Sequence, residues 1–178
     1  MFINGQWRDS AADQIYEVVN PATGDQIAEF ASATDAEIED AVQAAQGALS
    51  TWGEVSLRDK ARYLFDLRGK FEEHFERLCR ILVQDHGRTI GEARGTLRRC
   101  IENIESACSA LLLLTKGEFV TDLAKGLDQA MVWEPRGVFL IITPNNIPMH
   151  AWSSYVPYAI ASGCPVVVSP SKSDPVCM

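Results

Sequence analysis

The chain has 178 residues, of which 16 are Lys or Arg and 24 are Asp or Glu, so its formal net charge is −8. Hydrophobic residues make up 47% and charged residues 22% of the chain, which is typical of a folded globular protein and argues against disorder. The negative net charge, without a basic stripe interleaved with aromatic residues, argues against a nucleic-acid or anionic-membrane partner.

Targeting, metal and disulfide signals are missing from the sequence. The first residues show no basic segment followed by a long apolar one, and no apolar stretch approaches the ~20 residues that cross a membrane. The five cysteines include no C-x-x-C pair, and their odd number does not suit a disulfide framework. The three histidines are not at metal-ligand spacing. We therefore expect a cytoplasmic protein with reduced thiols and neither a membrane segment nor a metal site.

Two β-hairpins are predicted at the amino terminus. Asn4-Gly5 lies between the apolar pairs of residues 2–7, which is the strongest short signal for a tight hairpin turn. A second strand pair is expected at residues 16–19 and 27–30, because the Pro and Gly of Asn20–Gly24 favour a turn between them.

Three helices are predicted next, each beginning at a hydroxyl residue followed three positions later by an acid. These N-caps are Thr34, Ser56 and Thr89. Gly87 is expected to end a helix. The apolar spacing of the second helix runs through Ala61, Leu64, Phe65, Arg68, Phe71, Phe75 and Leu78, and that of the third through Leu97, Ile101, Ile104, Cys108 and Leu111, with Cys108 expected in the core.

A β–α–β unit is predicted near the carboxyl end, after a further strand at residues 127–133. Residues 138–143 are almost continuously apolar and β-branched, which favours a strand covered on both faces. A helix is expected at 149–162, ended by Gly163, and the next strand at 166–168. Such a unit predicts parallel strands with a right-handed crossover.

The turn Thr143-Pro144-Asn145-Asn146-Ile147-Pro148 follows the first of these strands. Ligands of parallel sheets collect at this end of the strands. Asn146 offers an amide donor between two prolines, and such a donor can stabilise a developing oxyanion. An asparagine before a helix can equally act as a cap or form a local turn. The residues alone leave both roles open.

Residues 138–172 resemble the aldehyde dehydrogenase superfamily, in which a strand leads into a P-x-N-x-P turn, a helix and a valine-rich strand. The resemblance extends upstream to Phe2–Trp7, Asn20–Gly24, Asp85–Thr89 and Glu134–Val138. It implies an α/β fold, the incomplete amino-terminal part of an aldehyde dehydrogenase fold, with β-hairpins, helices and the start of a parallel Rossmann-like sheet.

The resemblance also implies a division of the chain into three parts. Residues 1–119 would be the amino-terminal part of the cofactor-binding domain, made of hairpins and helices. Residues 120–136 would be an oligomerisation-type β segment, and 137–178 would be the first β–α–β unit of the Rossmann-like sheet.

Site residues follow from the same resemblance. Asn146 matches the family's oxyanion-hole asparagine, and four neighbours match positions that line the nicotinamide cofactor's cleft: Ile142, Thr143, Pro144 and Asn145. Ser169 and Lys172 stand where the family has a lysine and a glutamate that hold the adenosine ribose. A cation at Lys172 would suit the 2′-phosphate of NADP. Alternatively, cofactor binding has been lost; both remain open.

Members of the family oxidise an aldehyde with NAD(P)⁺ through a cysteine thiohemiacetal. None of the five cysteines stands at the matching nucleophile position, and no glycine-rich pyrophosphate turn follows the last strand. We therefore expect an amino-terminal fragment that is inactive alone and that acts on a small aldehyde only in a complete enzyme, with its missing carboxy-terminal half and as a homo-oligomer. The alternative is a non-catalytic remnant used for oligomerisation or partner binding.

Overall fold

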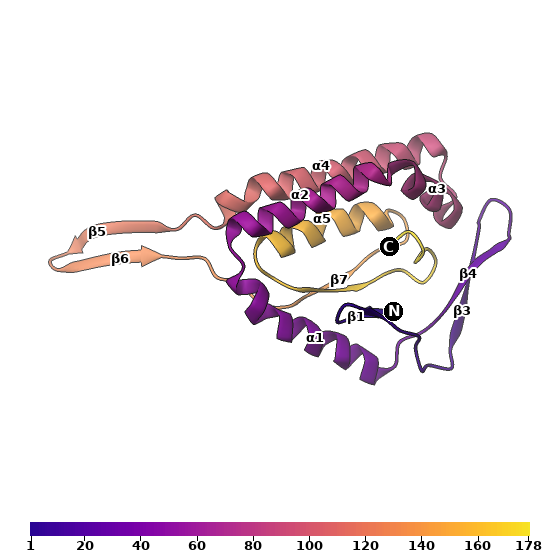
Figure 1. Cartoon of the computed structure of the whole chain (residues 1–178), viewed down its shortest axis with the longest axis horizontal. Helices are drawn as coiled ribbons and strands as arrows, with labels where there is room; N and C mark the ends of the chain where they lie inside the picture. Colours follow the sequence, from indigo (N-terminus) through magenta and orange to yellow (C-terminus); the bar gives the residue numbers. More distant parts are fainter.

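The computed structural model describes residues 1–178, apart from the side chain of Leu114. Two short hairpins, a group of helices, a protruding hairpin and a β–α–β unit follow one another along the chain (Figure 1). Their bounds are β1 (Phe2–Ile3), β2 (Gln6–Trp7), β3 (Ile15–Val19), β4 (Gln26–Ala31), α1 (Asp35–Glu54), α2 (Leu57–Glu73), α3 (Phe75–His86), α4 (Ile90–Leu114), β5 (Glu118–Ala124), β6 (Leu127–Met131), β7 (Phe139–Ile142), α5 (Pro148–Ala161) and β8 (Val166–Ser169).

Both amino-terminal hairpins are confirmed. Asn4 and Gly5 have φ angles of 51° and 75°, the left-handed pair that a two-residue hairpin turn requires. Strands β3 and β4 are antiparallel, and the rings of Tyr16 and Phe30, which face each other in the register, stack at 5.4 Å.

The predicted helix starts are confirmed as well. Thr34 and Thr89 form complete capping boxes, in which the hydroxyl accepts from the N–H three residues on and the acid accepts from the cap's own N–H. Ser56 accepts from the N–H of Asp59 at 3.2 Å. Gly87 ends α3 with a φ of 75°, in the left-handed conformation that glycine adopts without strain.

The second predicted helix is in fact two helices. The chain turns at His74, so that α2 ends at Glu73 and α3 begins at Phe75. The change of axis lets α2 pack against the carboxyl half of α4 and α3 against its amino half. Phe65, expected on the buried stripe, is 59% exposed. Apolar spacing continues on both sides of His74, so it does not reveal a change of direction.

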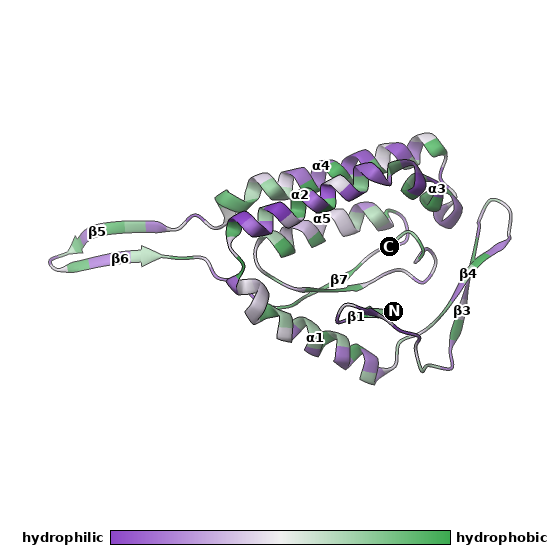
Figure 2. Cartoon of the chain, viewed as in Figure 1, coloured by the Kyte–Doolittle hydropathy of each residue, from purple (hydrophilic) through white to green (hydrophobic). Residues whose placement is uncertain are grey.

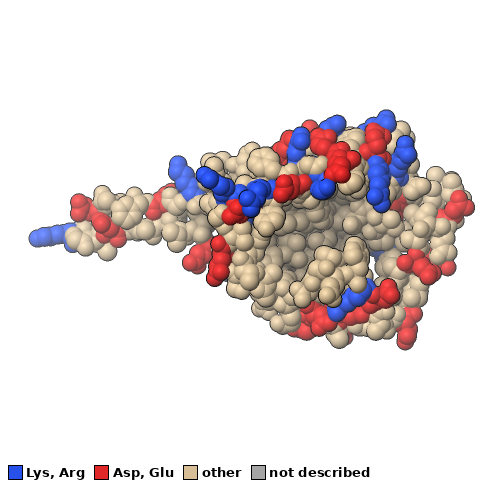
Figure 3. Space-filling model, in the orientation of Figure 1, with Lys and Arg blue, Asp and Glu red and all other residues tan. Residues whose placement is uncertain are grey.

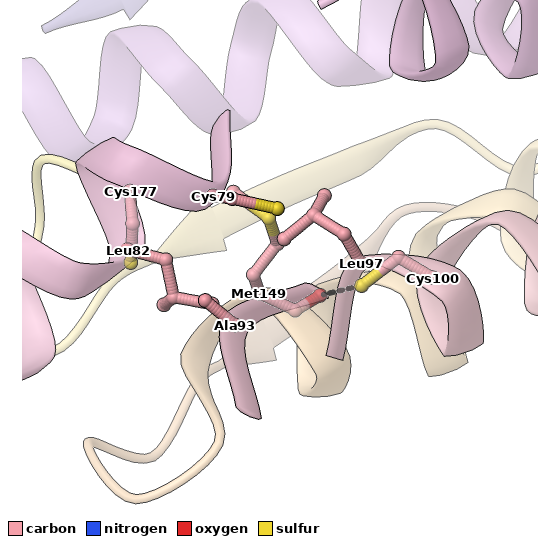
Figure 4. Close-up of a cluster of buried hydrophobic side chains, with 7 residues drawn as sticks. All are labelled: Cys79, Leu82, Ala93, Leu97, Cys100, Met149 and Cys177. Carbon is pink, nitrogen blue, oxygen red and sulfur yellow. Dashed lines mark hydrogen bonds between the residues drawn. The ribbon is translucent and has the colours of Figure 1, made fainter. Parts of the chain in front are cut away.

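The core lies where these helices meet α4 and α5. One cluster joins residues of α3 and α4 to Met149 and Cys177 (Figure 4). A second cluster joins Leu64 to Ala107, Leu111 and Ala161. Cys108 packs against the second cluster, as predicted. Acidic and basic side chains alternate over the outer helical surface (Figure 3), with pairs such as Arg68–Glu105 at 2.9 Å and Arg98–Glu72 at 3.0 Å.

Strands β5 and β6 form a hairpin that extends away from the rest of the molecule (Figure 1). Every residue of both strands is exposed, and several are apolar (Figure 2). The strand predicted at 127–133 is confirmed but ends at Met131, whereas β5 was not identified from its own pattern. Asp122, with a φ of 52°, interrupts the pairing within β5, and a strand exposed on both faces shows no alternation of apolar and polar residues.

Strands β7 and β8 are parallel, with Ile142 paired to Ser169, and α5 connects them. Pro148 occupies the first helical turn, and Gly163, with a φ of 83°, follows the helix end. The predicted β–α–β unit is therefore confirmed. Ile141 is buried, but Leu140 and Ile142 are 63% and 73% exposed, so this strand is covered on one face only. Among the described residues, no helix combines the length and apolarity needed to cross a bilayer.

Candidate functional site

The candidate site begins where β7 and β8 end side by side. Ile142 faces Ser169 in the register, and the N–H of Thr143 donates to the Ser169 carbonyl at 3.1 Å. Three predicted site residues, from two separate motifs, are thus brought together at the carboxyl edge of the strand pair. Pro144 and Asn145 follow at once and are exposed.

Asn146 is exposed, and within the described part of the chain its side-chain amide makes no hydrogen bond. The N-cap of α5 is Ile147, and no side chain caps this helix. Asn146 therefore does not act as a helix cap, which was the alternative role for this residue. Its amide remains available to a ligand.

Arg88 anchors the turn that carries Asn146. Its Nη2 donates to the backbone carbonyl of Asn146, which links the connection between α3 and α4 to the strand end. The sequence pattern indicates no individual role for Arg88, although this residue lies inside the Asp85–Thr89 step that contributes to the resemblance. A contact across 58 positions leaves no local signal in the sequence.

Thr143, Ser169 and Lys172 present polar groups near this edge. The hydroxyl of Thr143 is buried without a hydrogen-bond partner among the described residues. Ser169 and Lys172 are exposed, and the ammonium of Lys172 lies 5.6 Å from the ring centroid of Tyr16 in β3, a cation–π contact. The apolar side chain of Ile142, which is 73% exposed, lies at the same strand end.

A buried polar cluster lies at the carboxyl end of α3, beside the last residues of the chain. The N–H of Cys177 donates to Asp85 Oδ2 at 2.7 Å, and His86 Nε2 lies 3.9 Å from Asp174 Oδ2. Burial raises the pKa of both Asp85 and Asp174 above the ordinary value of 3.8. The cluster connects the Asp85–Thr89 segment to the residues that follow Lys172.

The cysteines of this chain are covered by the fold. Cys79, Cys100, Cys164 and Cys177 are buried and Cys108 is half-buried. Burial raises the pKa of Cys100 to about 11, and it also raises the pKa of Cys79, Cys108 and Cys177. A thiol of raised pKa is protonated at neutral pH and unreactive. No cluster of three or more potential metal ligands occurs among the described side chains.

The model of the aldehyde dehydrogenase family matches residues 7–178 of the chain. Malonate-semialdehyde dehydrogenase 1 of Geobacillus kaustophilus is 37% identical over 175 residues, and malonate-semialdehyde dehydrogenase of Bacillus pumilus is 38% identical over 175; each match covers 98% of this chain and 36% of the relative.

Solved structures give the same result. The methylmalonate-semialdehyde dehydrogenase of Oceanimonas doudoroffii superposes with a TM-score of 0.94 at 36% identity, and the match covers 99% of this chain and 36% of that one. A betaine aldehyde dehydrogenase mutant of Staphylococcus aureus, crystallised with NAD⁺, gives a TM-score of 0.93 at 26% identity over 99% of this chain and 36% of its own. The chain therefore spans about a third of the length of the relatives it matches.

Proposed function

Because the chain belongs to the aldehyde dehydrogenase family, we propose that it forms the part of an NAD(P)⁺-dependent aldehyde oxidation site that carries the oxyanion donor and the cofactor edge. The observation that carries this proposal is the uncommitted amide of Asn146 on a turn fixed by Arg88 and by two prolines. A fixed amide in such a place is suited to a charge that appears only during reaction.

The proposed role of Asn146 is to donate a hydrogen bond to the aldehyde oxygen when a thiolate adds to the carbonyl carbon. The oxygen gains a full negative charge in this step, so the bond is stronger in the transition state than with the neutral aldehyde. Loss of one such donor costs about 2.7 to 4 kcal/mol in known oxyanion holes. Arg88 would keep the donor in place through the Asn146 carbonyl.

The proposed cofactor contacts lie along the same edge. Ile142, Thr143, Pro144 and Asn145 would contact the nicotinamide half, and Ser169 and Lys172 the adenosine ribose. When bound, the cofactor accepts the hydride of the aldehyde. Lys172 would favour a 2′-phosphate over a free hydroxyl, by about fivefold for one exposed charge pair. Calorimetric titration with NADP⁺ and NAD⁺, before and after Lys172→Glu, checks this preference; a preference unchanged by the substitution contradicts it.

The proposed substrate is a short aldehyde that also carries a carboxylate. The malonate- and methylmalonate-semialdehyde dehydrogenases named above, at 36 to 38% identity, support this class. The thiolate would come from residues other than these 178, since each cysteine present is at least half-buried.

The β5–β6 hairpin supports a second, structural role for residues 120–136, namely contact with another copy of the chain. Large apolar side chains are exposed on this hairpin, including Phe119 at 65%, Leu123 at 55% and Leu127 at 52%. Exposed apolar strand edges favour pairing with another chain. Sedimentation of the chain and of a double variant, Phe119→Lys with Leu123→Lys, tests this contact. Equal sedimentation of the two proteins at tens of micromolar would contradict the proposed contact.

A hybrid enzyme tests the main proposal. Residues 1–178 would replace the corresponding segment of the Geobacillus kaustophilus malonate-semialdehyde dehydrogenase, and reduction of NAD(P)⁺ would be followed with malonate semialdehyde. We expect turnover by the hybrid and none by the 178-residue chain alone. Aldehyde-dependent turnover by the chain alone, or a folded hybrid of native size without turnover, would contradict the proposal.

A further inference from the structure

A pocket of about 420 Å³ lies where four segments of the chain meet, at the junction of α1 and α2. Its volume falls within the range of ~300 to 1,000 Å³ that small-molecule sites occupy. The segments are the α1–α2 junction, the residues after α4, those after β6 and the end of α5. The lining includes Val55, Ser56, Lys60, Thr115, Trp133 and Ser162.

Lys60 is the charged residue of this lining, and it is only 5% exposed. Its ammonium group makes one hydrogen bond, to the carbonyl of Gly53, at the long distance of 3.5 Å. Within the described residues, no carboxylate lies within ion-pair distance of it. A lysine has three N–H donors, so two of those of Lys60 have no acceptor among the residues that the structure describes.

The surroundings of Lys60 compensate its charge only in part. Its Nζ lies 5.9 Å from the ring centroid of Trp52. The nitrogen also lies near Gly163, past the carboxyl end of α5, where helix carbonyls are electronegative. Burial nevertheless lowers the pKa of Lys60 below its ordinary value of 10.5. An isolated buried charge is costly, and a bound anion would remove that cost.

Two further features of the pocket favour an anion with an apolar body. Leu57 lies in the first turn of α2 and lines the pocket. The first helical hydrogen bond of α2 runs from the Lys60 N–H to the Ser56 carbonyl at 2.9 Å. The backbone N–H of Leu57 therefore has no helical acceptor and can donate to an anion. The nearby Asp59 does not line the pocket, and its carboxylate pairs with Arg62 at 3.0 Å. The lining also includes the apolar side chains of Val132 and Trp133, which are 72% and 62% exposed.

We propose that this pocket binds a small organic carboxylate, whose charged group is held by the ammonium of Lys60 and whose apolar body lies against Val132 and Trp133. The site lies at the base of the β5–β6 hairpin, because Gly117 precedes β5 and Trp133 follows β6. A bound carboxylate would therefore contact the residues that join this hairpin to the rest of the protein.

The test is a nuclear magnetic resonance titration of the whole 178-residue chain with benzoate and, as a matched neutral ligand, benzyl alcohol. We expect benzoate to shift the amide of Leu57 and the indole N–H of Trp133, and to bind at least about tenfold more tightly than benzyl alcohol, as for a hydrogen bond to a charged group. Equal affinity for the two ligands, or shifts that do not include these two groups, would overturn the proposal.

Variants give an independent check. Lys60→Met removes the charge at similar length and should weaken benzoate binding at least about tenfold, whereas Lys125→Met, at the exposed tip of the hairpin, should leave it within about twofold. If Lys60→Met does not fold, Trp133→Ala is used instead, because the Trp133 side chain is mostly exposed and its loss should not prevent folding. Trp133→Ala should weaken the binding of benzoate and of benzyl alcohol to the same extent. Unchanged benzoate affinity in the variant that folds would overturn the proposal.

Discussion

The helical side of the protein and the β7–β8 strand pair differ in how fully their apolar residues are covered. On α4, Leu97 and Ile104 are completely buried, whereas on β7 Leu140 and Ile142 are 63% and 73% exposed. Helices α1, α2 and α4 also carry side-chain caps, and a surface ion pair links α2 to α4, but α5 begins without a side-chain cap beside the turn that holds Asn146. The helices therefore contain most of the buried apolar residues, whereas the strand edge leaves its groups exposed.

The two regions should respond very differently to the same truncation. Leu97→Ala leaves a cavity in the core between α3 and α4, and we expect a loss of about 3 kcal/mol in the free energy of unfolding. Leu140→Ala removes a mostly exposed side chain, and we expect a change of about 0.5 kcal/mol or less. Urea unfolding of both variants checks the difference. Similar losses would mean that the strand pair is covered in solution, for example by another copy of the chain.

Acid should change the stabilising effects of two carboxylates, Glu37 and Asp174, in opposite directions. Hydrogen bonds from Thr34, Ser10 and Ala11 hold the pKa of Glu37 at about 2, below its ordinary 4.5, so its stabilising contribution is present above pH 4.5 and is lost as the pH falls toward 2. Asp174, buried in the cluster at the carboxyl end of α3, has a raised pKa. It destabilises the fold when charged, and this cost is relieved as the pH falls toward 3.8.

Substitutions separate these two contributions. Glu37→Gln should make stability fall less between pH 4.5 and 2 than in the unsubstituted chain. Asp174→Asn removes the opposing gain and should make stability fall more steeply as pH 3.8 is approached from above. Unfolding curves collected across this range check both, and parallel pH profiles for the three proteins would contradict the assignment.

The sequence predicted best what depends on neighbouring residues. The Asn4-Gly5 turn, the three N-caps and the stop at Gly87 each rest on contacts within about four positions, and all were confirmed. The turn at His74, the buried Lys60 and the anchor from Arg88 depend on contacts across the fold, so no local pattern indicates them. Asn146 lies between these cases, because its turn was predicted but the freedom of its amide was not.

The role of Asn146 is the claim on which the account rests. Its most direct test is the kcat of the hybrid enzyme described above after Asn146→Ala, compared with Asn145→Ala as the adjacent control. We predict that Asn146→Ala lowers kcat by a factor of about 10² to 10³, the loss expected for one oxyanion donor, and that Asn145→Ala has a much smaller effect. Equal effects of the two substitutions, or a kcat that Asn146→Ala leaves unchanged, would contradict the account.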